Sequence, residues 1–226
     1  MRKKYNKTRC KRQVVFFDFD NTITPYDILD DMLSRFSKDR RWLALEKKWK
    51  RGEIGSRECL DGQIKGLKTR KNGLDEYLAG IRLDPYFKKI IRLLHSHRIK
   101  TVVLSDNFDY IIDFIVRNNA IGKLKVYSNK LRLVKDRLLP DFPYQDKKCH
   151  TCAHCKAKNL LANVDKDSII FYVGDGHSDI CPAKYADIVF AKEDLLEHFK
   201  DNGLFYLPYK SLKDVYMYFK RRIYER

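Results

Sequence analysis

Four short runs of mostly apolar residues are spread along the chain, and they lie at Val14–Phe17, Thr101–Leu104, Ser168–Val173 and Asp187–Phe190. A continuous apolar run without polar alternation is typical of a strand that is buried on both faces. Strands of this kind occur in parallel sheets that have helices on both sides. The sequence therefore predicts an α/β protein with a Rossmann-like, doubly wound, mostly parallel sheet.

Amphipathic segments lie between these strands, as a parallel sheet requires. In the segment Tyr86–His97 the apolar residues recur at helical spacing, at Phe87, Ile90, Ile91 and Leu94. That spacing places them on one face of a helix. The segments Phe108–Val116 and Leu212–Phe219 follow the same pattern. Residues 123–141 instead alternate between apolar and polar side chains, which predicts a β-hairpin.

A long helical stretch without a convincing strand separates the first two predicted strands. Its predicted helices are Asp27–Phe36, Trp42–Lys50, Arg57–Lys65 and Leu74–Ala79. Because the stretch interrupts the alternation of strand and helix, we expect it to be an insertion. The predicted organisation is a catalytic core of residues 1–25 and 85–226, with a small helical cap of residues 26–84 inserted after the first strand.

The chain is strongly basic, with a formal net charge of +17 from 47 basic and 30 acidic side chains. Such a field attracts anions, including phosphate esters and nucleic acids. The basic residues are nevertheless scattered along the chain, and the densest groups are the N-terminal arm Met1–Gln13 and the block Lys38–Arg51. A solvated basic surface is the simpler interpretation, so a nucleic-acid partner is not favoured.

The N-terminal arm resembles the start of a signal peptide only superficially. The apolar run behind it, Val14–Phe17, ends at Asp18 and is too short for the apolar region of such a peptide. No run approaches the roughly 20 apolar residues that a membrane span needs. We therefore expect a cytoplasmic protein with a mobile N-terminal arm. The sequence leaves the oligomeric state open.

The first acidic motif, Asp18-Phe19-Asp20-Asn21-Thr22, directly follows the first predicted strand. Asp18 and Asp20 are two residues apart, so they point the same way at the carboxyl end of the strand, where open α/β sheets bind their ligands. A divalent cation such as Mg²⁺ would offset the repulsion between the two carboxylates. One carboxylate could then attack a phosphorus atom while the other transfers protons. A simple acidic turn is the alternative.

A second acidic motif, Gly174-Asp175-Gly176-His177-Ser178-Asp179, follows the third predicted strand. Asp175 could complete a cation site with the first motif, and Asp179 could support that site from the next helical turn. The glycines allow the backbone to approach closely. Acids from two strand ends are what a Mg²⁺ site requires, so the pair of motifs is more informative than either alone.

Two single residues could contact the phosphate. Ser105 follows the second predicted strand, and its hydroxyl could donate to a phosphate oxygen. Lys156 could neutralise both the nucleophile and the phosphate. The choice between Lys156 and Lys158 cannot be made from composition, because the chain holds 47 basic residues.

Three cysteines, Cys149, Cys152 and Cys155, follow the pattern C-x2-C-x2-C, with His150 and His154 between them. Thiolate and imidazole ligands suit zinc, and the same cysteine spacing occurs in iron–sulfur proteins. One short window would have to supply every ligand of such a site. A reduced loop that is structural or sensitive to oxidation is therefore favoured over a zinc site, and both alternatives stay open.

The order of these motifs closely resembles that of the haloacid dehalogenase (HAD) superfamily of phosphatases. The resemblance covers nearly the whole chain, and the inserted helices are similar to the cap of its phosphoserine-phosphatase-like branch. Within that branch the chain is most similar to the enol-phosphate phosphatases of methionine salvage, which also have a cysteine-rich stretch before the motif lysine. The triplet Ser105-Asp106-Asn107 departs from their Ser-Gly-Gly and looks more like the phosphatases of phosphoethanolamine and phosphocholine.

The resemblance implies a role for each motif residue. Asp18 is implied to be the nucleophile and a Mg²⁺ ligand, and Asp20 the general acid/base, which also binds the metal through its carbonyl. Asp175 is implied to bind Mg²⁺, and Asp179 to support the metal shell. The residues expected to bind the phosphate or the rest of the substrate are Thr22, Ser105, Asp106, Asn107, Lys156 and Asp27. Asp27 could equally be a plain helix N-terminal acid.

The expected function is therefore that of a Mg²⁺-dependent phosphomonoester phosphatase that forms a phospho-aspartate on Asp18. Its substrate would be a small phosphorylated metabolite of the enol-phosphate, phosphoserine or phosphoethanolamine/phosphocholine type. A phosphatase or binding module for nucleic-acid ends, and a catalytically inactive scaffold, are the alternatives.

Overall fold

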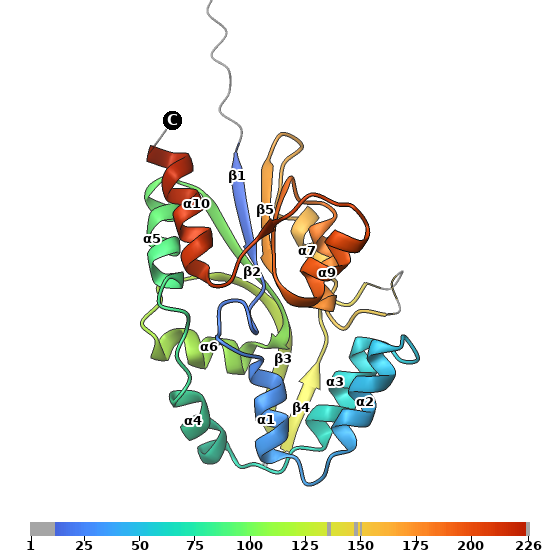
Figure 1. The fold of residues 1–226 in the computed structure, drawn as a ribbon. Helices are drawn as coiled ribbons and strands as arrows, with labels where there is room; N and C mark the ends of the chain where they lie inside the picture. The colour runs from blue at the N-terminus through green and yellow to red at the C-terminus, as the bar shows by residue number, and fades with distance from the viewer. Residues whose placement is uncertain (1–11, 135–136, 147–148, 150, 225–226) are drawn as a thin grey trace, which may run out of the picture.

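The computed structural model describes residues 12–134, 137–146, 149 and 151–224 (Figure 1). The predicted mobility of the N-terminal arm concerns residues that lie almost entirely outside this range, so it stays a prediction. Within the described residues, no helix has the length and apolar character that crossing a membrane would need.

One sheet of seven strands forms the centre of the protein, in the order β4-β3-β2-β1-β5-β6-β7. The strands are β1 (Gln13–Phe17), β2 (Lys100–Phe108), β3 (Lys125–Val134), β4 (Arg137–Asp141), β5 (Ile169–Gly174), β6 (Ile188–Ala191) and β7 (Leu207–Pro208). All neighbouring strands are parallel except β3 and β4, which form the predicted antiparallel hairpin. The predicted fold class, an α/β protein with a mostly parallel sheet, is confirmed.

Strand β1 lies between β2 and β5, and its side chains enter the core on both faces of the sheet. Val15 and Phe17 pack into one apolar cluster, and Val14 and Phe16 pack into another. This alternation explains why the run from Val14 to Phe17 contains no polar residue. It also fixes where β1 ends, because Asp18 is the first charged side chain after the buried run.

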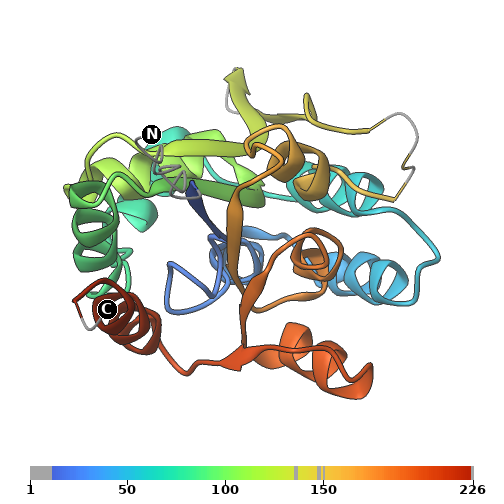
Figure 2. The ribbon, with the colours of Figure 1, turned by 90° about the horizontal axis from the view of Figure 1, so that it is seen from above.

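Helices cover both faces of this sheet (Figure 2). The cluster around Val15 and Phe17 includes residues of α5 (Phe87–Ser96), α6 (Asp109–Asn118) and α10 (Leu212–Tyr224). The cluster around Val14 and Phe16 includes residues of α7 (Lys156–Leu161), α8 (Ile180–Ala183) and α9 (Glu193–Asp201). The sheet is therefore doubly wound, as the sequence predicted.

Four helices lie between β1 and α5 in the chain and gather beyond the carboxyl end of β1 (Figure 1). They are α1 (Ile28–Phe36), α2 (Arg41–Lys50), α3 (Ser56–Lys65) and α4 (Lys71–Ala79). Asp27 begins α1, because its side chain accepts a hydrogen bond from the Asp30 backbone at 2.8 Å. The inserted helices therefore stand over the edge of the sheet where the acidic motifs lie.

The second strand is longer than the sequence indicated. Strand β2 continues past Leu104 as far as Phe108, and its register with β3 shifts between these two residues. Ser105, Asp106 and Asn107 thus lie on an irregular part of the strand and not on a loop after it. A register shift of this kind turns side chains away from the regular pleat.

Candidate active site

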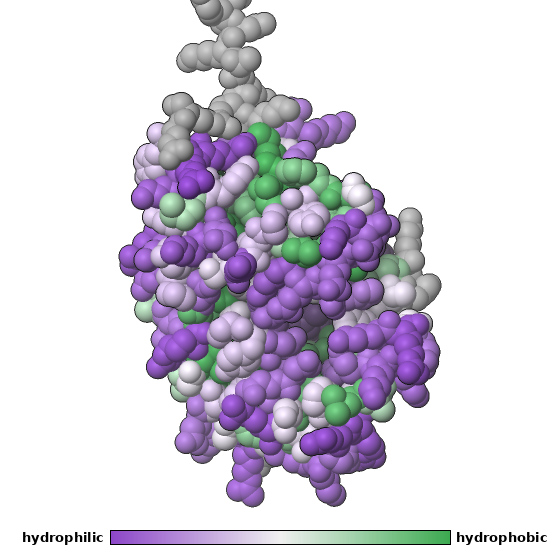
Figure 3. Space-filling view, in the orientation of Figure 1, coloured by the Kyte–Doolittle hydropathy of each residue, from purple (hydrophilic) through white to green (hydrophobic). Residues whose placement is uncertain are grey.

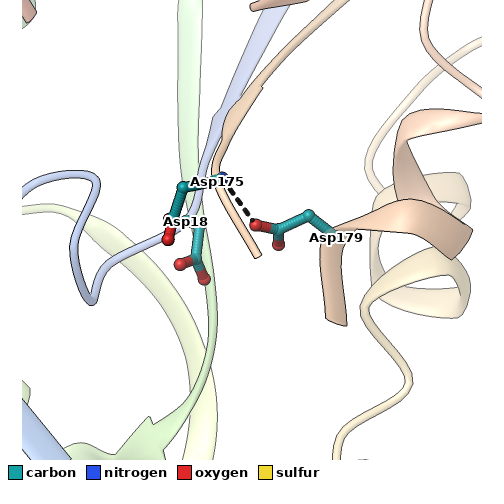
Figure 4. A group of neighbouring side chains, drawn as sticks. All are labelled: Asp18, Asp175 and Asp179. Atoms are coloured by element: carbon teal, nitrogen blue, oxygen red, sulfur yellow. Dashed lines mark hydrogen bonds between the residues drawn. The ribbon is translucent and has the colours of Figure 1, made fainter. Parts of the chain in front are cut away.

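Three carboxylates meet at the carboxyl ends of β1 and β5 (Figure 4). Asp18 follows β1, Asp175 follows β5, and Asp179 lies in the short 3-10 helix His177–Asp179. One oxygen from each carboxylate lies within 4.8 Å of the other two, and all three residues are buried. The structure therefore brings together the two acidic motifs that the sequence placed 157 positions apart, from Asp18 to Asp175.

Lys156 is the cation that faces these acids. Its Nζ atom donates to Asp18 Oδ1 at 2.6 Å, to Asp179 Oδ1 at 2.7 Å and to Ser178 Oγ at 2.9 Å. The residue is only 3% exposed. Lys158, in contrast, is an exposed residue whose ion-pair partner, Asp146, lies at 3.8 Å. The geometry thus distinguishes the two lysines that composition could not separate.

Asp179 holds the second motif in shape. Its Oδ2 atom accepts hydrogen bonds from the backbone nitrogens of Asp175 at 3.0 Å and Gly176 at 3.1 Å. Its Oδ1 atom accepts from Lys156 and from the Tyr172 hydroxyl at 2.7 Å. Both oxygens of this carboxylate are therefore occupied by donors of the protein itself.

Asp20 is fixed by the irregular part of β2. The Asn107 side-chain amide donates to both carboxylate oxygens of Asp20 at 3.0 Å, and the Ile28 backbone donates to one of them at 3.1 Å. Ser105 is fully buried, and its hydroxyl accepts from the Asn107 backbone at 3.0 Å. The triplet 105–107 thus positions Asp20 through Asn107.

Thr22 turns toward the second motif. Its hydroxyl donates to Asp175 Oδ1 at 2.6 Å and lies 3.2 Å from the Tyr209 hydroxyl. The Asn21 amide donates to the other oxygen of Asp175 at 3.0 Å. Thr22 and Ser105 are both absent from the described residues that line the cavity, so the Thr22 hydroxyl acts on Asp175 and the Ser105 hydroxyl on the Asn107 backbone in this conformation.

A cavity of about 260 Å³ opens above these residues, between the sheet edge and the inserted helices. Figure 3 shows a hollow on this face, surrounded mainly by hydrophilic residues. Its floor is formed by Asp18, Asp20, Asn107, Lys156 and Asp175. Its walls include Asp27, Asp30, Glu46, Trp49, Ser56, Gln63, Asp106, Glu193 and Asp194. The cavity is large enough for a small organic molecule, and nine of the 22 described residues that line it are acids.

Asp18 and Asp175 lie close to other acids and are buried away from water, and both conditions raise their pKa values. Burial, and then the charge of Asp179, raise the pKa of Asp18 well above its usual value and that of Asp175 to about 7. Burial alone would lower the pKa of Lys156, but the charges of Asp179 and Asp18 hold it well above its usual value. One lysine does not compensate three aspartates, so the floor of the cavity has an excess of negative charge.

The donor set suits a hard divalent cation. Magnesium prefers oxygen ligands and is commonly held by one or two carboxylates together with substrate phosphate. Asp18 and Asp175 offer carboxylate oxygens on either side of a common point, and the excess negative charge there is what such an ion would neutralise. The residues present therefore fit a magnesium ion.

A second group of acids lies on the inserted helices. Burial, and then the charges of Asp27 and Glu46, raise the pKa of Asp30 to about 7. Burial also raises the pKa of Asp27, which caps α1 and at the same time lines the cavity. Asp30 and Glu46 were not predicted to belong to the site, because charged residues at helical spacing are normally solvated, and neither was Trp49 beside them.

The cysteine motif forms a loop beside the site. The sulfur atoms of Cys149 and Cys152 lie 3.7 Å apart, whereas Cys155 is buried next to Lys156. In the described part of the chain, these three sulfurs do not gather as closely as the oxygens of the three aspartates. His154 donates from Nδ1 to the Ser105 carbonyl at 2.9 Å, and its Nε2 accepts from the Asn159 amide at 2.7 Å.

Comparison with known families supports the reading of the motifs. The family model described as "Putative Phosphatase" matches residues 13–200. The chain belongs to this family. It is thus a hydrolase of phosphoric monoesters, and the assignment to the phosphoserine-phosphatase-like branch of the HAD superfamily is confirmed.

The chain is similar to curated proteins over most of its length. The 2-hydroxy-3-keto-5-methylthiopentenyl-1-phosphate phosphatase of Bacillus pumilus (strain SAFR-032) is 24% identical over 209 residues, which cover 91% of this chain and 90% of the relative. The bifunctional enzyme MtnB/MtnX of Bacillus licheniformis is also 24% identical, over 95% of this chain and 50% of that larger relative.

Solved structures share the fold at low sequence identity. A phospho-aspartyl intermediate analogue of phosphoserine phosphatase superimposes with a TM-score of 0.71 at 18% identity, covering 92% of this chain and 99% of that one. The phosphoserine phosphatase from T. onnurineus gives a TM-score of 0.69 at 16% identity, covering 93% and 95%. At such identities the likeness shows the fold alone.

Proposed function

We propose that the protein hydrolyses a small phosphorylated metabolite through a phospho-aspartate intermediate on Asp18, with Mg²⁺ as its cofactor. The observation that carries this proposal is the meeting of Asp18, Lys156 and Asp175 on the floor of a cavity that the inserted helices cover. A nucleophile, a fixed cation and a place for a second cation are what phosphoryl transfer needs, because positioning and electrostatics dominate that reaction.

The Mg²⁺ ion would be held by the carboxylates of Asp18 and Asp175 and by the backbone carbonyl of Asp20. When bound, it would neutralise negative charge on the phosphoryl group and on the attacking carboxylate. Asp179 would act from behind, because it holds the backbone nitrogens of Asp175 and Gly176 and so fixes the loop that carries the ligand Asp175. We therefore assign Asp179 to the support of the metal shell.

The chain's own residues divide the chemistry between them. An oxygen of Asp18 attacks phosphorus, the bond between phosphorus and the ester oxygen breaks, and the alcohol leaves with a proton from Asp20. Burial, and then the charge of Asp27, raise the pKa of Asp20 well above its usual value, which favours the protonated form that a general acid requires. Asp20 then takes a proton from the water that attacks the phospho-aspartate.

The phosphoryl group is held mainly by Lys156 in this proposal. Lys156 already contacts Asp18, so the same ammonium group can bind an oxygen of the transferred phosphoryl. Thr22 contributes by orienting Asp175, and Ser105 contributes by shaping the strand that carries Asn107. Asp106 lines the cavity wall, and its Oδ1 atom is buried without a protein hydrogen-bond partner among the described residues.

The cavity favours an alcohol half that carries positive charge. Asp30, Glu46 and Trp49 line the cavity from the inserted helices. There, Lys50 pairs with Glu46 Oε1 at 3.4 Å and thereby offsets part of the charge of Glu46. Carboxylates and an aromatic ring together recognise an ammonium group. Three substrate types were expected. Phosphoserine and phosphoethanolamine or phosphocholine carry an ammonium group on the alcohol half, so they fit this cavity better than an enol-phosphate, whose alcohol half is uncharged. The same acids oppose a nucleic-acid end, whose phosphates they would repel.

The covered cavity also supports the predicted division of the chain. We propose that residues 26–84 act as a cap, which closes over a core of residues 1–25 and 85–226 and excludes water during transfer. The cytoplasmic location remains a prediction.

A panel of phosphomonoesters tests this function. Phosphate release is measured with and without Mg²⁺ on phosphoserine, phosphoethanolamine, phosphocholine, the methionine-salvage enol-phosphate, nucleotides and 5′-phosphorylated oligonucleotides. We expect Mg²⁺-dependent turnover that is highest on an amine-bearing ester. Highest turnover on oligonucleotides, with a steep loss of activity as salt increases, would contradict the substrate class and favour the nucleic-acid alternative.

A further inference from the structure

Two partly exposed thiols face each other on the loop that precedes the active-site lysine. The sulfur atoms of Cys149 and Cys152 are 3.7 Å apart, and both cysteines are free. The Cys149 sulfur also lies 3.1 Å from the Thr151 hydroxyl. The proposed phosphatase mechanism uses neither thiol.

Ser56 of the inserted helices makes direct hydrogen bonds with described residues of this loop. The Ser56 backbone nitrogen donates to the Thr151 carbonyl at 2.7 Å, and the Ala153 backbone nitrogen donates to the Ser56 hydroxyl at 2.6 Å. Ser56 is the first residue of α3 and lines the cavity. Thr151, which lies between the two cysteines in the chain, is thus a direct contact between the loop and the cap.

The other end of the loop is tied to the core. His154 holds the Ser105 carbonyl, and the Cys155 backbone nitrogen donates to the Tyr144 carbonyl at 3.0 Å. Lys156 follows immediately and begins α7. Because this end is fixed, a movement of the segment 149–152 is taken up at the contact with Ser56.

The two thiols differ in their pKa. The hydrogen bond from the Thr151 hydroxyl, followed by backbone N–H groups, lowers the pKa of Cys149. Burial raises the pKa of Cys152 to about 12. An accessible thiol with a lowered pKa is the one that an oxidant attacks first, and the neighbouring sulfur, 3.7 Å away, resolves the sulfenic acid as it gives up its proton to the departing hydroxide.

We propose that Cys149 and Cys152 are a site of reversible disulfide formation by hydroperoxides, and that the disulfide weakens the contact between the loop and the cap at Ser56. The Cys149 thiolate attacks the peroxide and becomes a sulfenic acid, and hydroxide or alkoxide leaves. The Cys152 thiol then displaces water from the sulfenic acid, which forms the disulfide. The peroxide is reduced by two electrons, and the two thiols together supply them.

The present distance between the two sulfur atoms sets how far they must move to form the disulfide. A disulfide bond is about 2.05 Å long, so the sulfurs must approach by roughly 1.7 Å from their separation of 3.7 Å. Side-chain rotation can supply part of this approach, and a shift of Thr151 by only about 0.8 Å is enough to lengthen the hydrogen bond from 2.7 Å past the roughly 3.5 Å at which such bonds are lost. A weakened cap contact should impair substrate binding more than the chemical step.

The test begins with the modification itself. The reduced full chain is treated with hydrogen peroxide, free thiols are alkylated, and the tryptic peptide 149–156 is sequenced by mass spectrometry. We expect loss of two hydrogens with Cys155 alone alkylated, and recovery after dithiothreitol. A Cys152–Cys155 or Cys149–Cys181 pair, sulfinic acid at Cys149, or about one equivalent of zinc in the purified protein would overturn the proposal.

The effect on the cap has two readouts. Hydrogen exchange of the Ser56 amide should become at least several-fold faster on oxidation, and this readout needs no phosphatase activity. The KM on the best ester of the panel should rise several-fold while kcat stays within about twofold; this second readout rests on the proposed function. Cys149→Ser should abolish both responses, and Cys181→Ser, which removes an exposed thiol outside the pair, should retain them. A mapped disulfide with unchanged Ser56 exchange would refute the coupling.

Discussion

Gly174 makes room for the side chain that organises the site, so replacing it with alanine should disturb both stability and catalysis. A methyl group at this position would lie 2.5 Å from Asp179 Oδ2 and 2.9 Å from the Tyr172 ring. Neither neighbour is the free end of a flexible side chain, because Asp179 is held by the loop and by Lys156. The Gly174→Ala change must therefore push Asp179 away from its donors.

The added methyl group should reduce stability by overpacking, and it should reduce turnover by displacing catalytic groups. Inserting a methyl group into a well-packed site destabilises by about 1–3 kcal/mol, which lowers Tm by roughly 2–4 °C for each kcal/mol in a chain of this size. Displacing Asp179 also moves Lys156, and a misplacement of about 1 Å at a catalytic group reduces turnover on the order of 100-fold. We expect both effects in Gly174→Ala.

Thermal unfolding and kcat/KM on the best ester of the panel measure these two effects. Gly176→Ala is the matched control for stability, because a methyl group there meets nothing within 4 Å and the backbone is extended with φ at −107°. It should change the free energy of unfolding by no more than about 0.5 kcal/mol. Wild-type stability and activity in Gly174→Ala would refute the packing described for Asp179.

Three further changes test separate parts of the site. Lys156→Met should lower kcat/KM by about three orders of magnitude or more, whereas Lys158→Met should leave it nearly unchanged; equal losses would contradict the assignment of the lysine. Asp30→Asn should raise KM for amine-bearing esters by about tenfold and spare neutral esters, and equal effects on both would exclude an ammonium subsite. Burial lowers the pKa of His154 from 6.5 to about 3, so its neutral form stabilises the fold above pH 6.5 and that contribution is lost as pH falls toward 3. The free energy of unfolding should therefore fall less between these two pH values in His154→Gln than in the wild type. An equal fall in the two proteins would refute this.

Much of the site could be predicted because its residues follow directly from strand ends. The buried run of β1 ends at Asp18 and that of β5 ends at Gly174, so the positions of the two acidic motifs at one sheet edge follow from parallel pairing. The hairpin and the inserted helices were likewise visible as local patterns. Local periodicity is sufficient for such elements because they contain their own hydrogen bonds.

What the sequence left open depends on contacts between distant segments. Lys156 is selected among the basic residues only because α7 brings it against Asp18 and Asp179. Tyr209 reaches Thr22 from the far end of the chain, and no motif announces it. The direction of the Thr22 hydroxyl depends on Asp175 and Tyr209, which lie far from it in the chain, and a single sequence does not reveal such partners.

The substrate-binding wall was also hidden for a physical reason. Asp30, Glu46 and Trp49 occur on short helices whose sequence patterns are those of exposed surfaces. They become part of the cavity only when α1 and α2 fold over the carboxyl edge of the sheet. A pattern of side chains predicts which face of a helix is polar, but it does not predict which polar face covers a ligand.

The most direct test of the central proposal is to trap the phosphoryl group on Asp18. The enzyme is mixed with excess phosphoethanolamine or the best ester of the panel and Mg²⁺, quenched in acid within one turnover, and the peptide that contains Asp18 is examined by mass spectrometry. We expect one added phosphoryl group on Asp18, only with Mg²⁺, and none in folded Asp18→Asn, which should also be inactive. Turnover with no phosphoryl group on Asp18, or full activity in Asp18→Asn, would contradict it.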